Sequence, residues 1–521
     1  GLLAYPFLIE PFLDVHSQLA RWAVAFTGFA LSVVPACLAV RPKEAEAAPG
    51  RAARGAPATP RGARLFWLAC AFVPSVMLLA ATNHVTVDIA ATPLLWVLPL
   101  ALYLVSFIVA FGGFRSALRG GLLVLWVAGA IGLSMNAFAQ GTATLSRQLG
   151  VTLVALFASC LLCHGELALE RPPAHALTAY YLIIAAGGAL GGVFVTLVAP
   201  LVFSDFYELE LGTAATFVVL LIASRRRHEH SWSRSSRAVL LVGCGVCLPL
   251  LVGSVVVRTE RETRGGRVVE RRRSFLGPLR VVDIPEGRVL THGRIQHGLE
   301  LRDPAHRSMP TMYFGPGTAL ERVLRHHHEG QRRSIGVVGL GIGTIAAYGE
   351  RGDHLRFYEL DPNVVELARR DFDFLRDTRA HIEVVVGDGR LALARELPHA
   401  FDVLVLDAFS SDAVPVHLLT QEAFAIYAGH LAPDGILLVN VSNRHLAVDR
   451  VVESSARAQG LTCLFVETPS NPALHVSHVE WGIAARDPAF AALLGGLPII
   501  TPSRPEVLFT DTRASVLAIV R

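Results

Sequence analysis

The chain has 521 residues, 52% of them hydrophobic and only 17% charged, and its mean hydropathy is +0.46. This composition is too apolar for a protein that is water-soluble throughout, while the length allows several domains. The formal net charge is +4, and the arginine clusters flank apolar stretches, so we attribute them to membrane topology and expect no nucleic-acid partner. Disulfides are not expected to hold the fold, because six of the seven cysteines lie in apolar segments.

Long apolar segments fill the first half of the chain, up to residue 257. About 20 apolar residues suffice to cross the hydrocarbon core of a bilayer, so we predict a transmembrane helical domain over residues 1–257, with the lipid bilayer as a partner. A Pro/Ala/Arg-rich stretch at residues 41–64 is predicted to be a linker. About eight spans are predicted, at residues 22–40, 65–81, 93–111, 121–138, 151–163, 176–203, 209–224 and 238–257.

Two patterns within these spans have both a structural and a functional interpretation. Four glycines of the span at 176–203 recur in pairs, Gly187 with Gly188 and Gly191 with Gly192, which favours close helix packing over a ligand groove. The CxxC pairs at 160–163 and 244–247 have apolar neighbours and no second ligand pair. We therefore predict no metal site in the chain.

After residue 257 the pattern changes to short alternating strands separated by Gly-Pro and Glu-Gly turns. This pattern predicts a small β-hairpin domain over residues 258–330. Near its end, His326, His327 and His328 are consecutive and therefore point different ways around a helix. A solvated helix end accounts for them better than a metal site.

A glycine turn at residues 339–343 is the feature around which the rest of the chain is organised. An apolar, β-branched run precedes Gly339, Gly341 and Gly343, and helix-compatible residues follow, so we read strand, turn, helix and strand. Glycine lets a ligand approach the backbone and permits positive φ in the turn. About 20 residues on, Glu359 ends the next strand, where a carboxylate can accept hydrogen bonds from a ribose diol.

Three further acids follow strands that a doubly wound sheet would place side by side. Asp388 and Gly389 end the strand at 381–386, Asp407 ends the strand at 401–406, and Asp412 follows in the next loop. Ligands of such sheets lie at the carboxyl ends of the strands. We therefore predict a Rossmann-like domain over residues 331–521 whose acids converge on one ligand.

These motifs resemble those of the spermidine synthase (aminopropyltransferase) family, and the whole chain is similar to its membrane-fused bacterial branch, the fused transporter/spermidine synthase-like proteins. The resemblance covers roughly residues 274–450 and is most specific in LDAFSSDAVPVHLLT. The other matching segments are HGRIQHG, PTMYFGPG, GLGIGT, FYELDPNVV and VVGDGR.

The resemblance implies a small N-terminal β-domain followed by an α/β Rossmann-like, methyltransferase-type domain, and a transferase with no tightly bound cofactor. The co-substrate would be decarboxylated S-adenosylmethionine, bound by the glycine turn, and the acceptor a polyamine such as putrescine. By motif, Glu359 would hold the ribose and Asp388 the adenine, while Gln296 and Tyr313 would line the donor and amine pocket. Asp407 would be the catalytic base or orienter, and Asp412 would bind the polyamine.

The chain departs from the family at the glycine turn, where Ile342 replaces the usual aspartate for the donor's amine. The hairpin that we expect nearby is basic, with His292, Arg294 and His297, and would suit a carboxylate better. A second hypothesis is therefore a lyase or cyclotransferase that acts on intact S-adenosylmethionine and releases methylthioadenosine. A third is a polyamine transporter or sensor with a binding-only domain, and a fourth is a methyltransferase. The oligomeric state stays open, and a homodimer is one candidate.

Two sequence features predict opposite orientations of the protein in the membrane. Arg and Lys are dense in residues 41–64 and 224–237, which places those loops in the cytoplasm and, counting forward, carries the last domain outward. An adenosyl site argues for the cytoplasm, where such compounds are made, and a single re-entrant segment would reverse the count. We expect a multi-pass protein of the inner (cell) membrane with a cytoplasmic catalytic domain.

Overall fold

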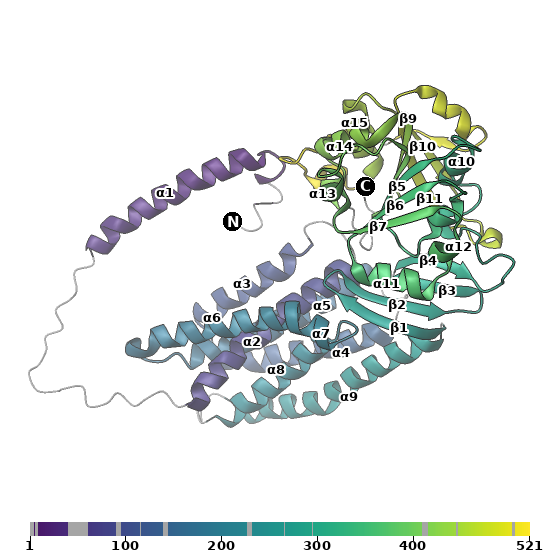
Figure 1. Ribbon diagram of the computed structural model, residues 1–521. Helices are drawn as coiled ribbons and strands as arrows, with labels where there is room; N and C mark the ends of the chain where they lie inside the picture. Colours follow the sequence, from purple (N-terminus) through teal and green to yellow (C-terminus); the bar gives the residue numbers. More distant parts are fainter. Residues whose placement is uncertain are drawn as a thin grey trace, which may run out of the picture.

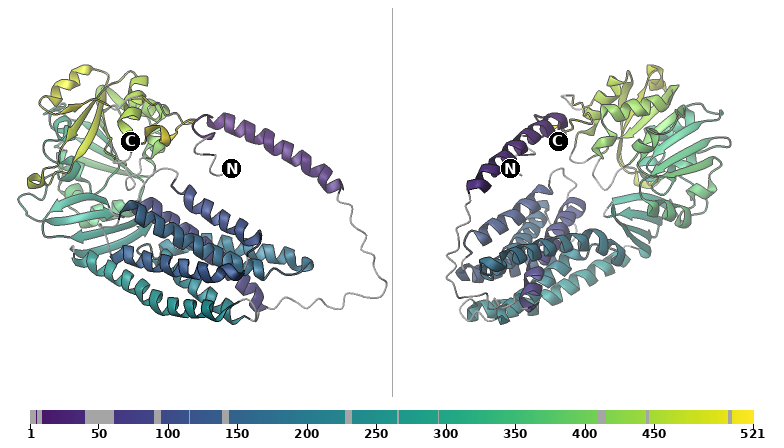
Figure 2. Two further views of the ribbon diagram at one scale, coloured as in Figure 1. Left: turned by 180° about the vertical axis from the view of Figure 1, so that it is seen from behind. Right: turned by 60° about the vertical axis from the view of Figure 1, so that its left-hand side comes forward.

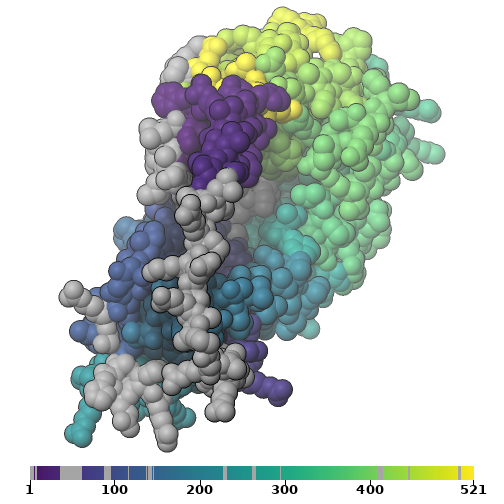
Figure 3. Space-filling model, turned by 90° about the vertical axis from the view of Figure 1, so that its left-hand side faces the viewer, coloured from purple at the N-terminus to yellow at the C-terminus, as the bar shows by residue number. Residues whose placement is uncertain are grey.

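The computed structural model describes residues 5, 9–39, 61–89, 95–114, 116–138, 144–226, 232–264, 266–293, 295–408, 415–443, 446–502 and 506–521. Its first half is helical (Figure 1). The helices are α1 (Val15–Ala39), α2 (Arg61–Asn83), α3 (Val97–Phe111), α4 (Arg119–Phe138), α5 (Leu145–Leu169), α6 (Leu177–Val193), α7 (Ala199–Val202), α8 (Glu208–Arg225) and α9 (Arg234–Arg264). Helices α2 to α9 form one bundle, whereas α1 stands apart from it beside the C-terminal segment, coloured yellow (Figures 2 and 3).

Five of the described helices are long and apolar enough to cross a membrane, fewer than the eight predicted spans. They cover Arg61–Thr86, Arg119–Asn136, Ser146–Leu169, Ala174–Val202 and Arg234–Glu260. Helix α3 is apolar but has only 15 residues, and α8 carries Glu208, Glu210 and Arg225 within 18 residues. The predicted domain boundary at 257/258 falls inside α9. Of the linker predicted at 41–64, residues 41–60 lie outside the described residues, whereas residues 61–64 form the start of α2 and are therefore not linker.

Two of the four paired glycines of α6, Gly187 and Gly191, serve close helix packing as predicted, whereas a Cβ atom on Gly188 would meet nothing within 4 Å. A Cβ atom on Gly187 would lie 2.6 Å from the carbonyl oxygen of Leu68, and one on Gly191 would lie 2.6 Å from that of Phe72. Both carbonyls belong to α2, so only glycine lets the two backbones approach this closely.

The two ends of the bundle differ in charge. Arg226 pairs with Glu170 over 2.8 Å and donates to the carbonyl of Gly62 over 2.9 Å, which brings the start of α2 and the ends of α5 and α8 together at the end remote from the sheets. At the other end, residues 203–210 contact Arg258 and Arg273. The described segments 84–89 and 203–207 at that end contain no Lys or Arg.

A small antiparallel sheet lies between the bundle and the rest of the chain (Figures 1 and 2). Its order is β1 (Arg267–Ser274), β2 (Gly277–Asp283), β3 (Gly287–His292) and β4 (Ile295–Leu301). The register of β3 against β4 shifts between Leu290 and Thr291, which marks a β-bulge.

The large sheet has the order β12-β10-β11-β9-β8-β5-β6-β7. Strands β5 (Ser334–Val338), β6 (His354–Glu359), β7 (His381–Val386), β8 (Phe401–Leu406) and β9 (Leu431–Asn440) are parallel. Strands β10 (Thr462–Thr468), β11 (Val479–Ala485) and β12 (Ile499–Ile500) join antiparallel. Helices α10 (Ala319–His326), α11 (Pro362–Asp371), α12 (Phe374–Asp377), α13 (Gly389–Leu393), α14 (Gln421–His430) and α15 (Val448–Ala458) complete this unit.

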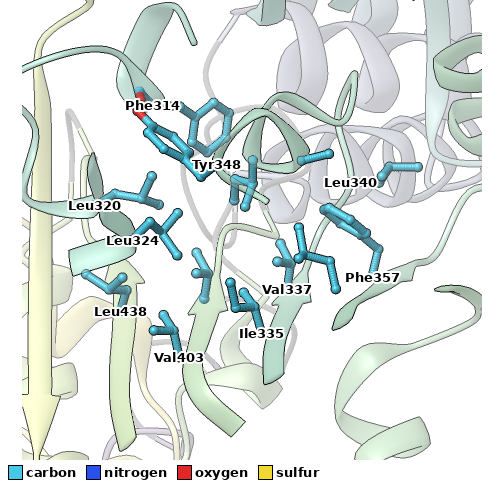
Figure 4. Close-up of a cluster of buried hydrophobic side chains, with 14 of the residues drawn as sticks. Phe314, Leu320, Leu324, Ile335, Val337, Leu340, Tyr348, Phe357, Val403 and Leu438 are labelled. Carbon is cyan, nitrogen blue, oxygen red and sulfur yellow. Dashed lines mark hydrogen bonds between the residues drawn. The ribbon is translucent and has the colours of Figure 1, made fainter. Parts of the chain in front are cut away.

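A buried apolar cluster supports the glycine turn (Figure 4). Ile335 and Val337 of β5 are fully buried in it with Phe357 of β6. The helix predicted after the turn is only a 3₁₀ segment, Thr344–Tyr348, because Gly349 takes an extended conformation and ends it. The packing of β5 against β6 therefore holds the glycine turn in place.

The histidine run at 326–328 is not merely a solvated helix end. His328 has φ +54°, and its Nδ1 lies 3.0 Å from Asp402 Oδ1 while its Nε2 lies 2.8 Å from Asp434 Oδ2. Both ring nitrogens thus face carboxylates, so the side chain links the end of α10 to β8 and β9. This link lies at the amino ends of the strands, opposite the edge that carries the predicted acids.

Candidate functional site

A cavity at the carboxyl ends of the parallel strands brings most of the predicted site residues together. It contains about 890 Å³ of empty space, part of it open to solvent. The acids and the histidine that line it from the unit built on the large sheet are Glu359, Asp361, Asp388, Asp407 and His417. Strands β2 and β3 and the start of β4 close the other side, so the cavity lies between the two sheets.

The glycine turn forms the floor of this cavity. Gly339, Gly341 and Gly343 have φ values of +101°, +54° and +83°, a region that favours glycine. A Cβ atom on Gly339 would also lie 2.2 Å from the carbonyl oxygen of Asp407. Gly339 and Gly341 line the cavity, whereas Gly343 is not among the lining residues and packs toward Leu375.

Glu359 is held at the tip of β6 by the backbone. Its carboxylate accepts the amide of Leu340 over 3.0 Å and that of Asp361 over 2.8 Å. Burial raises the pKa of this carboxyl, and the two amide hydrogen bonds partly oppose the rise. Each oxygen keeps acceptor capacity, so the carboxylate can still receive hydroxyl groups of a ligand.

Asp388 serves the protein's own structure as well as the cavity. One oxygen caps α13 by accepting the amide of Leu391 over 2.8 Å, and the other lies 2.8 Å from Nε2 of His417. Gly389 follows it, and a Cβ atom there would lie 2.7 Å from the side chain of Val338. Both residues line the cavity.

Asp407 is the acid whose environment is most suited to proton transfer. Burial raises the pKa of its carboxyl to about 7, and a hydrogen bond from Nδ2 of Asn440, 2.8 Å away, partly opposes this rise. Tyr313 lines the same cavity, and burial together with the charge of Asp407 raises the pKa of its phenol. A carboxyl with a pKa near 7 can exchange protons at neutral pH.

The wall contributed by the small sheet carries two histidines. The Nε2 atom of His292 lies 2.8 Å from the carbonyl oxygen of Leu276, whereas Nε2 of His297 is buried without a partner among the described residues. Burial lowers the pKa of His297 to about 4, so its ring is neutral at pH 7. His297 therefore offers an unused nitrogen in the wall.

Several predicted residues lie elsewhere. The side chain of Gln296 is exposed and does not line the cavity. Ile342 is 1% exposed and packs toward Gly298 of β4, away from the cavity. Asp412 and Arg294 lie outside the described residues, so their predicted roles stay predictions.

The sequence prediction missed Asn440 and His417. Asn440 ends β9 in the same way that the predicted acids end their strands, so the strand-tip pattern could have identified it. His417 lies in a loop of the motif LDAFSSDAVPVHLLT, and only the structure brings it to Asp388.

The strand order and the cavity at the strand ends define a Rossmann-like unit of the methyltransferase type. No protein-family model matches the chain. Over 113 residues it is 32% identical to the polyamine aminopropyltransferase of Vibrio vulnificus (strain CMCP6), an alignment that covers 20% of this chain and 36% of that protein. Over 109 residues it is 29% identical to a probable polyamine aminopropyl transferase of Bifidobacterium longum (strain NCC 2705), covering 20% of this chain and 23% of that protein.

The chain is thus homologous to spermidine synthases, the polyamine aminopropyltransferases, at low identity and over part of its length. The matched part spans 36% or less of these curated relatives. An N-terminal histidine N-methyltransferase of Emericella nidulans is 33% identical over 109 residues, covering 20% of this chain and 19% of that protein.

Solved structures with similar folds include two spermidine synthases. The enzyme from Thermotoga maritima is 16% identical, with a TM-score of 0.30, over 48% of this chain and 84% of that one. A spermidine synthase in complex with the transition state analogue AdoDATO is 15% identical, with a TM-score of 0.29, over 48% and 83%. An O-methyltransferase from Bacillus cereus in complex with SAH is 14% identical, with a TM-score of 0.23, over 29% and 73%.

Proposed function

We propose that this chain is a membrane-bound, spermidine synthase-like transferase that moves an aminopropyl group from an adenosyl sulfonium donor to an amine. The donor would be decarboxylated S-adenosylmethionine and the acceptor a polyamine such as putrescine. The observation that carries the proposal is Asp407, a buried carboxyl with a pKa of about 7 in a cavity shared with Glu359 and the glycine turn. The homology to polyamine aminopropyltransferases supports the same class.

In this reaction the amine nitrogen attacks the carbon bound to the sulfonium sulfur. A C–N bond forms, the C–S bond breaks, and its electron pair stays on sulfur, so the leaving group is neutral methylthioadenosine. The amine proton passes to Asp407, which Asn440 holds in place by a 2.8 Å hydrogen bond. Glu359 and Asp388 would hold the ribose and adenine, and the remaining rate enhancement would come from alignment of the two substrates.

A second candidate is favoured by two observations on the opposite wall. Ile342 is buried in the core, so it cannot balance the donor's ammonium, and Nε2 of His297 is available for another group. An enzyme that accepts intact S-adenosylmethionine and releases methylthioadenosine as a lyase or cyclotransferase would place a carboxylate there. Incubation with each donor, with and without putrescine, distinguishes the two, because only the second releases methylthioadenosine from the intact donor without an amine.

The five long apolar helices support a multi-pass membrane location. Because adenosyl donors are made in the cytoplasm, we place the cavity on the cytoplasmic face. The arginine-rich loops at the remote end of the bundle argue for the reverse orientation, and cysteine labelling from the two sides of the membrane decides between them.

A further inference from the structure

Residues 203–210, which join the last part of the α6–α7 segment to α8, form the contact between the bundle and the small sheet. Most of this segment is half-buried, but its acids Asp205 and Glu208 are only 6% and 1% exposed. On the bundle side, Arg258 of α9 donates to the carbonyl oxygen of Phe206 over 3.3 Å and pairs with Glu210 over 3.4 Å. The loop is therefore fixed to the bundle.

On the other side, the loop binds Arg273, next to last in β1. The Arg273 guanidinium lies 2.5 Å from Oε1 of Glu208 and donates to the carbonyl of Asp205 over 2.8 Å. It also lies 4.5 Å above the ring of Phe206. The side chains of the Arg273–Glu208 pair are each only 2% exposed, so removing one partner leaves the other charge buried.

Arg273 is directly followed by residues that shape the cavity. It pairs with Pro278 in the β1–β2 register, and the turn between them contains Leu276, which lines the cavity. The carbonyl of Leu276 is the partner of His292 Nε2, 2.8 Å away, and His292 lines the cavity as well. A Cβ atom on Gly277 would lie 2.7 Å from that same nitrogen, so the turn and the histidine fit closely.

We propose that Arg273 is a positioning residue through which the membrane bundle holds the substrate wall of the cavity, formed by Leu276, Leu279 and His292. The Glu208–Arg273 pair fixes the end of β1, the end of β1 fixes the turn, and the turn fixes His292. The membrane half is thus part of the enzyme's substrate site rather than a detachable anchor. This inference rests on the proposed function for its kinetic consequence, but the ordering of the wall does not depend on it.

The test compares the full chain in lipid nanodiscs with variants Arg273→Gln, Glu208→Gln and Arg273→Lys. Arg272→Gln is the matched control, because the neighbouring Arg272 pairs over 2.5 Å with Glu366, whose side chain is 55% exposed. Hydrogen exchange without substrate should rise ~10-fold in residues 274–279 and 287–292 for the two Gln variants and stay within ~2-fold for the control. Arg273→Lys keeps the charge and should recover most of the protection.

Kinetics then test positioning separately from stability. The two Gln variants should raise the KM for the amine by ~10-fold while kcat changes less than ~3-fold, because a displaced wall weakens binding of the substrate equally in the ground state and the transition state. Unchanged hydrogen exchange overturns the inference, as does changed exchange with a KM equal to that of the control. If hydrogen exchange changes in the Gln variants but the wild type shows no turnover, the ordered wall is supported and the proposed function is refuted.

Discussion

The side-chain amide of Asn440, at the end of β9, donates a 2.8 Å hydrogen bond to Asp407, at the end of β8. Burial alone drives the pKa of Asp407 upward, and this hydrogen bond is the opposing influence. The pair therefore sets the pH at which this carboxyl can accept a proton, which in the proposed reaction would come from the amine.

Asn440→Leu should move the acidic limb of the pH–rate profile upward. A hydrogen bond to a charged group contributes about 1.5–3 kcal/mol, and one pKa unit corresponds to about 1.4 kcal/mol, so a shift of ~1 pH unit is expected. The measurement is kcat/KM from pH 5 to 9. A profile identical to that of wild type would show that Asn440 does not tune the base.

Asp407→Asn should abolish turnover and also change how stability depends on pH. The folded-state pKa of about 7 lies above the unfolded value of about 3.9, so the folded wild type binds more protons between these limits and loses stability as pH rises through that window. The Asp407→Asn variant has no carboxyl to ionise at this position, so it should not lose this stability as pH rises. Thermal unfolding should show the variant to be equal to wild type near pH 4 and more stable by ~1 kcal/mol or more at pH 8.

The control for this comparison is Asp434→Asn, on the opposite edge of the sheet. The hydrogen bond from His328 lowers the pKa of Asp434, so its contribution is lost as pH falls rather than as it rises. If Asp407→Asn were instead less stable than wild type at pH 8, burial of the ionised Asp407 carboxylate would not destabilise the folded protein.

Gly339→Ala should prevent ligand binding and destabilise the protein. The residue has φ +101°, and a Cβ atom would lie 2.2 Å from the carbonyl oxygen of Asp407. Gly460→Ala isolates the backbone strain, of order 1–2 kcal/mol, because Gly460 has φ +72° with nothing within 4 Å. In thermal unfolding, Gly339→Ala should lose more stability than Gly460→Ala, and in a titration with methylthioadenosine only Gly339→Ala should lose binding. Equal losses of stability in the two variants would contradict the clash.

The parallel strands and their terminal acids were predictable because each is a local pattern. An apolar run of β-branched residues followed by glycine or an acid identifies β5, β6, β7 and β8 without knowledge of their neighbours. The insertion of β11 between β9 and β10 depends on long-range pairing, which no local pattern shows.

The positions of Gln296 and His297 show why part of the site was not predictable. Side chains of a strand alternate between faces, so a shift of one residue exchanges which of two neighbours faces the cavity. The bulge between Leu290 and Thr291 changes the register beside them, and His297 lines the cavity while Gln296 is exposed. No local sequence pattern marks this bulge.

Cysteine labelling should establish the orientation of the protein. Leu397, in the unit built on the large sheet, is 85% exposed, and Ser235 is exposed at the remote end of the bundle. If the cavity faces the cytoplasm, a membrane-impermeant maleimide should label Ser235→Cys in intact cells and Leu397→Cys only after permeabilisation. The reverse pattern would follow the arginine distribution and place the cavity outside.

The most direct test of aminopropyl transfer is mass spectrometry of the products that the purified full chain forms from decarboxylated S-adenosylmethionine and putrescine. The proposed function predicts methylthioadenosine and spermidine in equal amounts, and neither from the Asp407→Asn variant. A methylated amine, or no methylthioadenosine from the decarboxylated donor, would contradict it.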